Sequence, residues 1–247
     1  ASEYKKHEEK YKNIGMVMSH EKTVRWWEDS TSLDNVKNIA RNARLVTFSG
    51  GEPLLVPEVI DILDAMDPLP NTYVTFSTNL TRVTDKFLNS IAKFPLVKIM
   101  VSLEGIEEHN DYIRYGSKWG TILENINKIK NLPNVDLVIS SVLQHTSIYS
   151  LPKLLVFVND LGLPSIQLNE IYINSYPDTG VLGINSAPPE KVNNFRTWLD
   201  NYSGVGKQQL LFWIDNYKYS PELNEKFNIY IDMLDQIRDT KFNLIFK

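Results

Sequence analysis

The strongest constraint on the fold is a regular alternation of short apolar, β-branched runs with amphipathic helical stretches. Between the runs, apolar side chains recur on one face, as Val59, Leu63 and Met66 do, and residues 151–161 form a second stripe that ends at Gly162. Strand, helix and strand in turn are typical of parallel βαβ units, so the sequence predicts an α/β fold. The predicted strands are residues 45–49, 73–77, 97–103, 137–142 and 166–173.

The alternation ends near residue 173, where a loop rich in proline, glycine and asparagine begins. No low-complexity linker divides the chain, so we expect an α/β domain over residues 1–175 with a C-terminal extension, residues 176–247, packed on it. The extension is predicted to contain two helices and a short extended tail. Outside the alternation, the predicted elements are helices at 3–13, 33–43 (capped by Ser32 or Thr31), 190–202 and 221–240, and the extended tail at 241–247.

Composition excludes several classes of function. The chain has no cysteine, so these residues form no disulfide, thiolate nucleophile, cysteine zinc site or cysteine-ligated cluster, and its four histidines are scattered. With 26 basic and 30 acidic residues, the formal charge of -4 argues against a nucleic-acid or membrane partner. No apolar run approaches the roughly 20 residues that span a bilayer. No secretory leader is recognisable, so a cytoplasmic protein is expected.

Small polar residues follow every predicted strand at its carboxyl end. In a parallel sheet these ends meet at one edge, which is where ligands bind in such folds. Five convergent polar ends therefore predict a binding site at that edge. The segments are Ser49-Gly50-Gly51-Glu52-Pro53, Ser77-Thr78-Asn79, Ser102-Leu103-Glu104-Gly105, the residues near Ser140, Ser141 and Gln144, and Asn169-Glu170.

Three of these segments carry a resemblance to a known family. "TFSGGEPLL" resembles the GGEP motif of radical S-adenosylmethionine (radical SAM) enzymes, "FSTNLT" is similar to their next strand, and "VSLEGIEEHNDYIRYGSKWGTILENI" resembles their S-L-D-G segment with an R-x-G tail. Order and spacing agree over residues 44–175. The pattern is most similar to relatives with SPASM or twitch extensions, which often act on peptides. The resemblance implies an open, partial (β/α)6-type TIM barrel, here without its first strand, and a helical C-terminal extension.

The resemblance also implies which residues bind the cofactor. Carbonyl groups beside glycine can approach an ammonium closely, and an arginine fork suits a carboxylate. Glu104 stands where the family commonly has aspartate, which leaves its role open. The implied S-adenosylmethionine contacts are Gly50, Gly51 and Glu52 at the amino group, with Pro53 fixing the turn, Ser102 and Arg114 at the ribose and carboxylate, and Thr78 and Asn79 near the ribose or the substrate.

Each of these roles has a plainer alternative. Arg114 could form a surface ion pair with Asp111 or Glu107, and Glu52 could be a solvated loop acid. Thr78 and Asn79 could serve ordinary turn and capping chemistry.

The missing cysteines are the large departure from the family. Its [4Fe-4S] cluster is held by a C-x3-C-x2-C loop after the first strand, and these residues offer no thiolate to hold one. Without the cluster, reductive cleavage of S-adenosylmethionine to a 5′-deoxyadenosyl radical is not available. Two explanations stay open: a cluster loop upstream of residue 1, or a degenerate relative. We favour the first, because a barrel that loses an edge strand exposes open hydrogen-bonding groups.

The leading hypothesis is therefore the body of a radical SAM enzyme that abstracts hydrogen from a peptide or small-molecule substrate once an upstream cluster loop is supplied. The alternative is a non-catalytic module that binds S-adenosylmethionine or a peptide. A cluster-free, aldolase-like barrel would need a catalytic lysine at a strand end. Lys98 lies inside a predicted strand, which argues against this third hypothesis.

Overall fold

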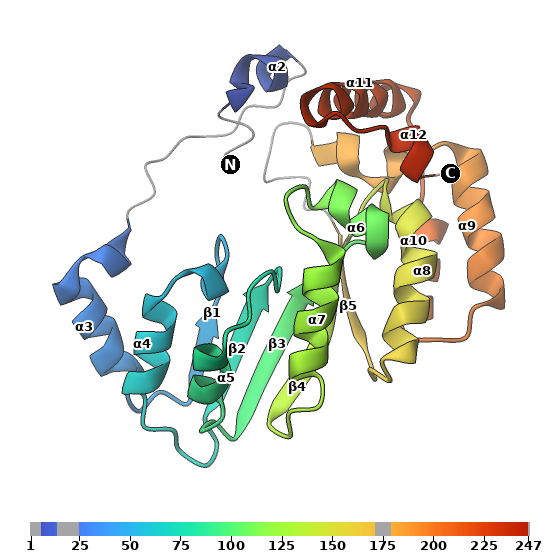
Figure 1. Ribbon diagram of the computed structural model, residues 1–247. Coiled ribbons are helices and arrows are strands. Elements are labelled where there is room, and N and C mark those ends of the chain that lie inside the picture. Colours follow the sequence, from blue (N-terminus) through green and yellow to red (C-terminus); the bar gives the residue numbers. More distant parts are fainter. Residues whose placement is uncertain (1–5, 14–24, 171–178, 247) are drawn as a thin grey trace. The chain divides into compact units, whose positions relative to one another are not determined.

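The computed structural model describes residues 6–13, 25–170 and 179–246 (Figure 1). These residues fall into two compact units. The sheet unit contains the described residues of 22–103 and 116–140, and the helical unit contains those of 6–13, 104–115 and 141–246. The predicted boundary at residue 175, and the predicted strand residues 171–173, lie outside the described residues.

The five predicted strands are present and follow one another in the order β1-β2-β3-β4-β5. The registers of β1 with β2, β2 with β3 and β3 with β4 are all parallel. Runs of β-branched and aromatic residues form these strands because such side chains pack well on a pleated surface. The strands are β1 (Leu45–Phe48), β2 (Tyr73–Thr78), β3 (Leu96–Ser102), β4 (Val135–Leu143) and β5 (Ile166–Glu170).

In the sheet unit, helices cover one face of the sheet. α4, α5 and α7 lie on the same side of the strands in Figure 1. Phe76 of β2 packs edge-on against Phe87 of α5. Val97, Ile99 and Val101 of β3 are fully buried, and the residues between them are half-buried. The helices of this unit are η1 (Trp26–Glu28), α3 (Ser30–Ala40), η2 (Pro53–Leu55), α4 (Glu58–Ala65), α5 (Asp85–Ile91) and α7 (Trp119–Ile129).

β1 is an edge strand in the part of the chain that the structure describes. It pairs with β2 alone, and its four residues are only half-buried or exposed, with Leu45 61% exposed. Val74 and Phe76 of the neighbouring β2 are completely buried. Burying a side chain of this size contributes roughly 1.5–3 kcal/mol, so β1 obtains much less stabilisation from its side chains than β2 does.

The predicted start of the first long helix was wrong. α3 begins at Ser30, and its cap is Asp29, whose carboxylate accepts a hydrogen bond from the Ser32 amide at 2.8 Å. Aspartate, serine and threonine are all good caps, so the local sequence did not decide between them.

The helical unit is held by an apolar cluster built from distant parts of the chain. Tyr112 of α6, Phe227 of α11 and Phe242 of α12 belong to it. The extended tail predicted for residues 241–247 was wrong, since Phe242–Ile245 is helical, and sequence patterns missed α6 and α10. The helices are α2 (Glu8–Asn13), α6 (Glu107–Ile113), α8 (Ser147–Asp160), η3 (Thr179–Leu182), η4 (Ile184–Ser186), α9 (Pro189–Asn201), α10 (Lys207–Asp215), α11 (Pro221–Arg238) and α12 (Phe242–Ile245).

His145 is the most deeply buried imidazole among the described residues, at 2% exposure. Its ring stacks on Phe227 at 3.6 Å between centroids, and its Nδ1 lies 2.9 Å from the Ser186 hydroxyl. That hydroxyl donates to the Gly183 carbonyl, so Nδ1 carries the proton that the Ser186 oxygen accepts. Burial lowers the pKa of His145 to about 3, which keeps the ring neutral at physiological pH.

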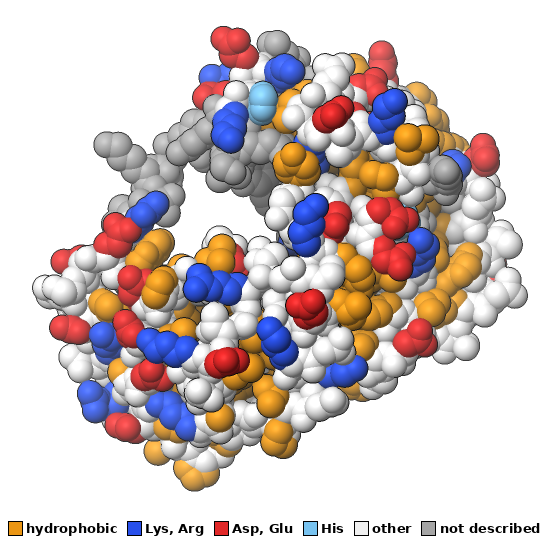
Figure 2. All heavy atoms as spheres, viewed as in Figure 1, with side chains coloured by type: hydrophobic (Ala, Val, Ile, Leu, Met, Phe, Trp, Pro, Cys, Tyr) orange, Lys and Arg blue, Asp and Glu red, His pale blue; other side chains and the backbone are white. Residues whose placement is uncertain are grey.

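The surface carries charges of both signs. Figure 2 shows acidic and basic side chains intermingled over the face in view. No helix among the described residues is long and apolar enough to cross a bilayer.

Candidate functional site

The loop that follows β1 exposes two glycines, Gly50 and Gly51, to solvent. Gly50 has a φ of +121°, a conformation that side chains rarely tolerate, and a Cβ added to Gly50 or Gly51 would meet nothing within 4 Å. Both glycines are exposed, and no hydrogen bond between described residues uses either carbonyl oxygen. Pro53 is buried and starts η2 directly after the loop. The loop therefore offers two unshielded acceptors at the carboxyl end of a strand.

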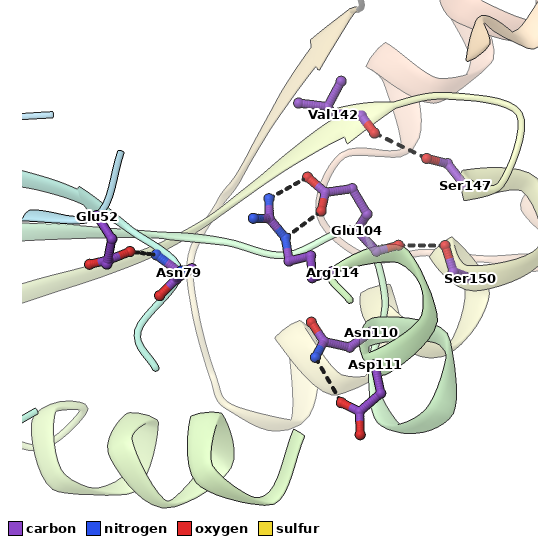
Figure 3. A network of polar contacts seen from close by, with 9 residues as sticks. All are labelled: Glu52, Asn79, Glu104, Asn110, Asp111, Arg114, Val142, Ser147 and Ser150. Carbon is purple, nitrogen blue, oxygen red and sulfur yellow. Dashed lines mark hydrogen bonds and ion pairs between the residues drawn. The ribbon is translucent and has the colours of Figure 1, made fainter. Parts of the chain in front are cut away.

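The Glu52 carboxylate is committed to the protein. Its Oε1 accepts from the Thr78 hydroxyl at 2.5 Å and from the Leu54 amide at 3.1 Å. Its Oε2 accepts from the Asn79 amide at 2.7 Å (Figure 3). A solvated loop acid, the plainer alternative, is therefore excluded, and the carboxylate joins the loop after β1 to the end of β2.

Thr78 and Asn79 perform the turn chemistry of the plainer alternative. The Thr78 hydroxyl also accepts from the Leu80 amide at 2.9 Å. The Asn79 side-chain oxygen accepts from the amide and the hydroxyl of Thr81, at 3.0 and 2.7 Å, which is an Asx turn. The Asn79 side-chain NH₂ group has no partner among the described residues, so its two donors are open to a ligand.

Helix α7 supports the turn at residues 78–81 that follows β2. Leu80 is fully buried with a φ of +54°, and the Asn125 side chain of α7 donates to its carbonyl at 2.9 Å. Holding a leucine in this uncommon conformation requires such support. In the same unit, the half-buried Ser102 ends β3 opposite Ser140 of β4.

In the helical unit, Arg114 forms a two-bond ion pair with Glu104 (Figure 3). Its Nε and Nη2 donate to the two carboxylate oxygens at 2.5 and 2.8 Å. The side chain of Glu104 is 5% exposed and that of Arg114 is 26% exposed. The Ser150 hydroxyl of α8 also donates to the Glu104 carbonyl. The alternative of a surface pair with Asp111 or Glu107 is therefore excluded. Of the five guanidinium N–H groups of Arg114, the two on Nη1 and one on Nη2 have no partner among the described residues.

The structure brings predicted residues together within each unit. In the sheet unit, Glu52, Thr78 and Asn79 form one network next to the two glycines, and in the helical unit Glu104 and Arg114 form an ion pair. Sequence reasoning missed Thr81, Asn125 and Ser150 as supporting residues. The Asn-x-Thr spacing was a usable signal for Thr81, because it suits an Asx turn.

Comparison with known proteins identifies the family. The radical SAM superfamily profile matches residues 16–145, which is more than half of the chain. The chain belongs to the radical SAM superfamily. No curated protein matches the sequence.

Solved structures of radical SAM enzymes resemble the chain at low sequence identity. Streptococcus suis SuiB bound to S-adenosylmethionine is 13% identical, with a TM-score of 0.50 over 76% of this chain and 43% of that one. SuiB bound to precursor peptide SuiA is 14% identical, with a TM-score of 0.49 over 69% and 39%. Native anSMEcpe with bound AdoMet and Cp18Cys peptide is 13% identical, with a TM-score of 0.48 over 77% and 54%. The chain spans about two fifths to a half of these proteins. The likeness to SuiB bound to S-adenosylmethionine confirms the predicted α/β partial-barrel fold.

The residues given do not fit the family's iron–sulfur cluster. A [4Fe-4S] cluster needs cysteine thiolates, and the sequence has none. Among the described residues, no group of three histidine, aspartate or glutamate side chains could hold a metal instead.

Proposed function

We propose that the sheet unit binds S-adenosylmethionine at the carboxyl ends of its strands. The observation that carries the proposal is the exposed Gly50-Gly51 loop, whose two unbonded carbonyls could accept hydrogen bonds from the ammonium of the methionine part. The Asn79 NH₂ group and the Ser102 hydroxyl are the neighbouring polar groups that could meet the ribose. Membership of the radical SAM superfamily supports this choice of ligand.

We further propose that the chain is the body of a radical SAM enzyme whose cluster-binding thiolates come from outside these residues. The half-exposed β1 supports this, because one of its edges has no partner strand among the described residues and a further strand could pair there. By themselves these residues would not cleave S-adenosylmethionine reductively. The substrate would be a peptide or a small molecule, and a SPASM or twitch type of relative remains our proposal for the subfamily.

Calorimetric titration with S-adenosylmethionine tests the binding site. Gly51→Val should weaken binding at least tenfold, because a side chain there blocks the approach to the carbonyls. Gly120→Val is the matched control, since a Cβ at Gly120 on α7 also meets only open space. Binding by the wild type and the control, and not by Gly51→Val, supports the proposal. Absence of binding by a folded wild-type chain contradicts it.

The second candidate is a non-catalytic module that binds S-adenosylmethionine or a peptide, and the lack of cysteine favours it. The reading frame upstream of Ala1 separates the two. A strand pattern followed by C-x3-C-x2-C supports the enzyme, whereas an initiator methionine directly before Ala1 supports the module.

A further inference from the structure

The carboxylate of Glu52 receives hydrogen bonds from two separate strand ends. One donor, the Leu54 amide, follows Glu52 in its own loop, and two donors, the Thr78 hydroxyl and the Asn79 amide, belong to the end of β2. We infer that Glu52 is a positioning residue: its carboxylate sets the spacing of the loops after β1 and β2 and does not itself bind the ligand. The consequence for ligand binding rests on the proposed S-adenosylmethionine site.

The geometry requires a carboxylate. An ionised carboxylate only accepts, and its two oxygens can take all three donors at once. A glutamine at this position would keep one acceptor oxygen and turn an NH₂ group toward the other donors. The Leu54 and Asn79 amides are fixed by the backbone, so at least one of them would lose its partner.

The network leads from Glu52 to the side chain that is open to a ligand. Glu52 accepts a hydrogen bond from the Asn79 backbone amide, and Thr81 donates to the Asn79 side-chain oxygen. Backbone and side chain of Asn79 are thus both fixed, which determines the direction of its NH₂ group. Thr78 links the same carboxylate to the Leu80 amide. Loss of the carboxylate should therefore displace the Asn79 side chain as well as the glycine loop.

The competing role for Glu52 is direct contact with the ligand ammonium. A double-mutant cycle separates the two roles, because residues that act through one network are non-additive. Positioning predicts that Glu52→Gln and Thr78→Val each weaken S-adenosylmethionine binding roughly tenfold, and that the double variant is no worse than the poorer single one. Direct contact predicts a far larger loss for Glu52→Gln than for Thr78→Val, because only Glu52 would touch the ligand. Glu124→Gln, the same change on the exposed face of α7, is the control and should bind as the wild type does.

Amide hydrogen exchange tests the positioning role without any ligand. In Glu52→Gln the Leu54 amide or the Asn79 amide should exchange at least tenfold faster than in the wild type, while the Ile99 amide in the core of the sheet keeps its rate. Unchanged exchange at both amides, or additive losses in the cycle, would overturn the inference. If the wild type binds no S-adenosylmethionine, the proposed function fails, and the exchange rates still decide whether Glu52 holds the two loops.

Discussion

The buried pair of Glu104 and Arg114 allows a quantitative prediction about stability. Replacing Arg114 with methionine keeps most of the volume and leaves a carboxylate that is 5% exposed without its partner. Breaking a buried pair in this way costs about 3–5 kcal/mol, because the remaining charge is uncompensated. For a chain of this size that loss corresponds to a fall in the melting temperature of about 6–20 °C.

The assay is urea denaturation of four proteins: the wild type, Arg114→Met, Glu104→Gln and the double variant. Glu104→Gln should cost about 1.5–3 kcal/mol, less than Arg114→Met, because the guanidinium left behind is 26% exposed and can turn to water. The double variant should be no less stable than Arg114→Met, since removing both charges removes the uncompensated one.

The control is Lys153→Met, which removes an exposed pairing with Glu107 and Glu108 at 3.5 and 3.6 Å in the same unit. Such exposed pairs contribute between zero and about 1 kcal/mol. If Arg114→Met costs no more than this control, the reasoning from burial is refuted.

Three further predictions concern acid stability and glycines. Burial holds the pKa of His145 at about 3, below the 6.5 of the unfolded chain, so on acidification the unfolded state binds the proton first. The free energy of unfolding should therefore fall as the pH is lowered from 6.5 to 3. Urea denaturation at pH 7 to 4 should show a smaller fall for His145→Gln than for the wild type, and parallel curves would argue against this. Gly50→Ala should lower the stability by about 1–3 kcal/mol, because the φ of Gly50 is +121°. Gly51→Ala should keep the wild-type stability and weaken S-adenosylmethionine binding. Thermal unfolding and calorimetry check the two effects, and equal stability of the two variants would disprove the first. Gly105→Ala places a Cβ 2.9 Å from the Cβ of His109 and should cost about 1–3 kcal/mol by the same thermal assay, and a neutral result would mean that α6 shifts freely.

Strand positions could be predicted because each strand is a short apolar run between clear breakers. The run starting at Tyr73 was expected to end at Ser77, and β2 ends one residue later. In the sheet unit, the placement of the polar ends of β1, β2 and β3 at one edge also followed from the sequence, since these strands are parallel and end on the same side.

The C-terminal elements could not be predicted because tertiary contacts decide them. Phe242 and Phe246 both pack into the cluster around Phe227. This packing favours a helical turn, although the local sequence of the tail predicts an extended segment. α10 begins after Gly206, which has a φ of +80°, without a side-chain cap, so the usual start signal is absent.

The partners of the candidate site residues depend on side chains that are far apart in the sequence. Nothing local indicates that Glu52 meets the end of β2, or that Arg114 pairs with Glu104 in preference to the nearer acids. Residue types and strand ends located the candidate site, but only the folded chain shows which polar groups are already used and which are open.

The simple order of the strands has a consequence for how this protein is made. From β1 to β4, each strand pairs with the strand that follows it in the chain. No pair of these strands therefore has to form around a strand that is synthesised later. Such local pairing lowers the contact order, and N-terminal parts fold first during synthesis. On the ribosome the sheet can therefore grow one strand at a time. A strand added at the edge of β1, which has no partner among the described residues, would leave every other pairing unchanged.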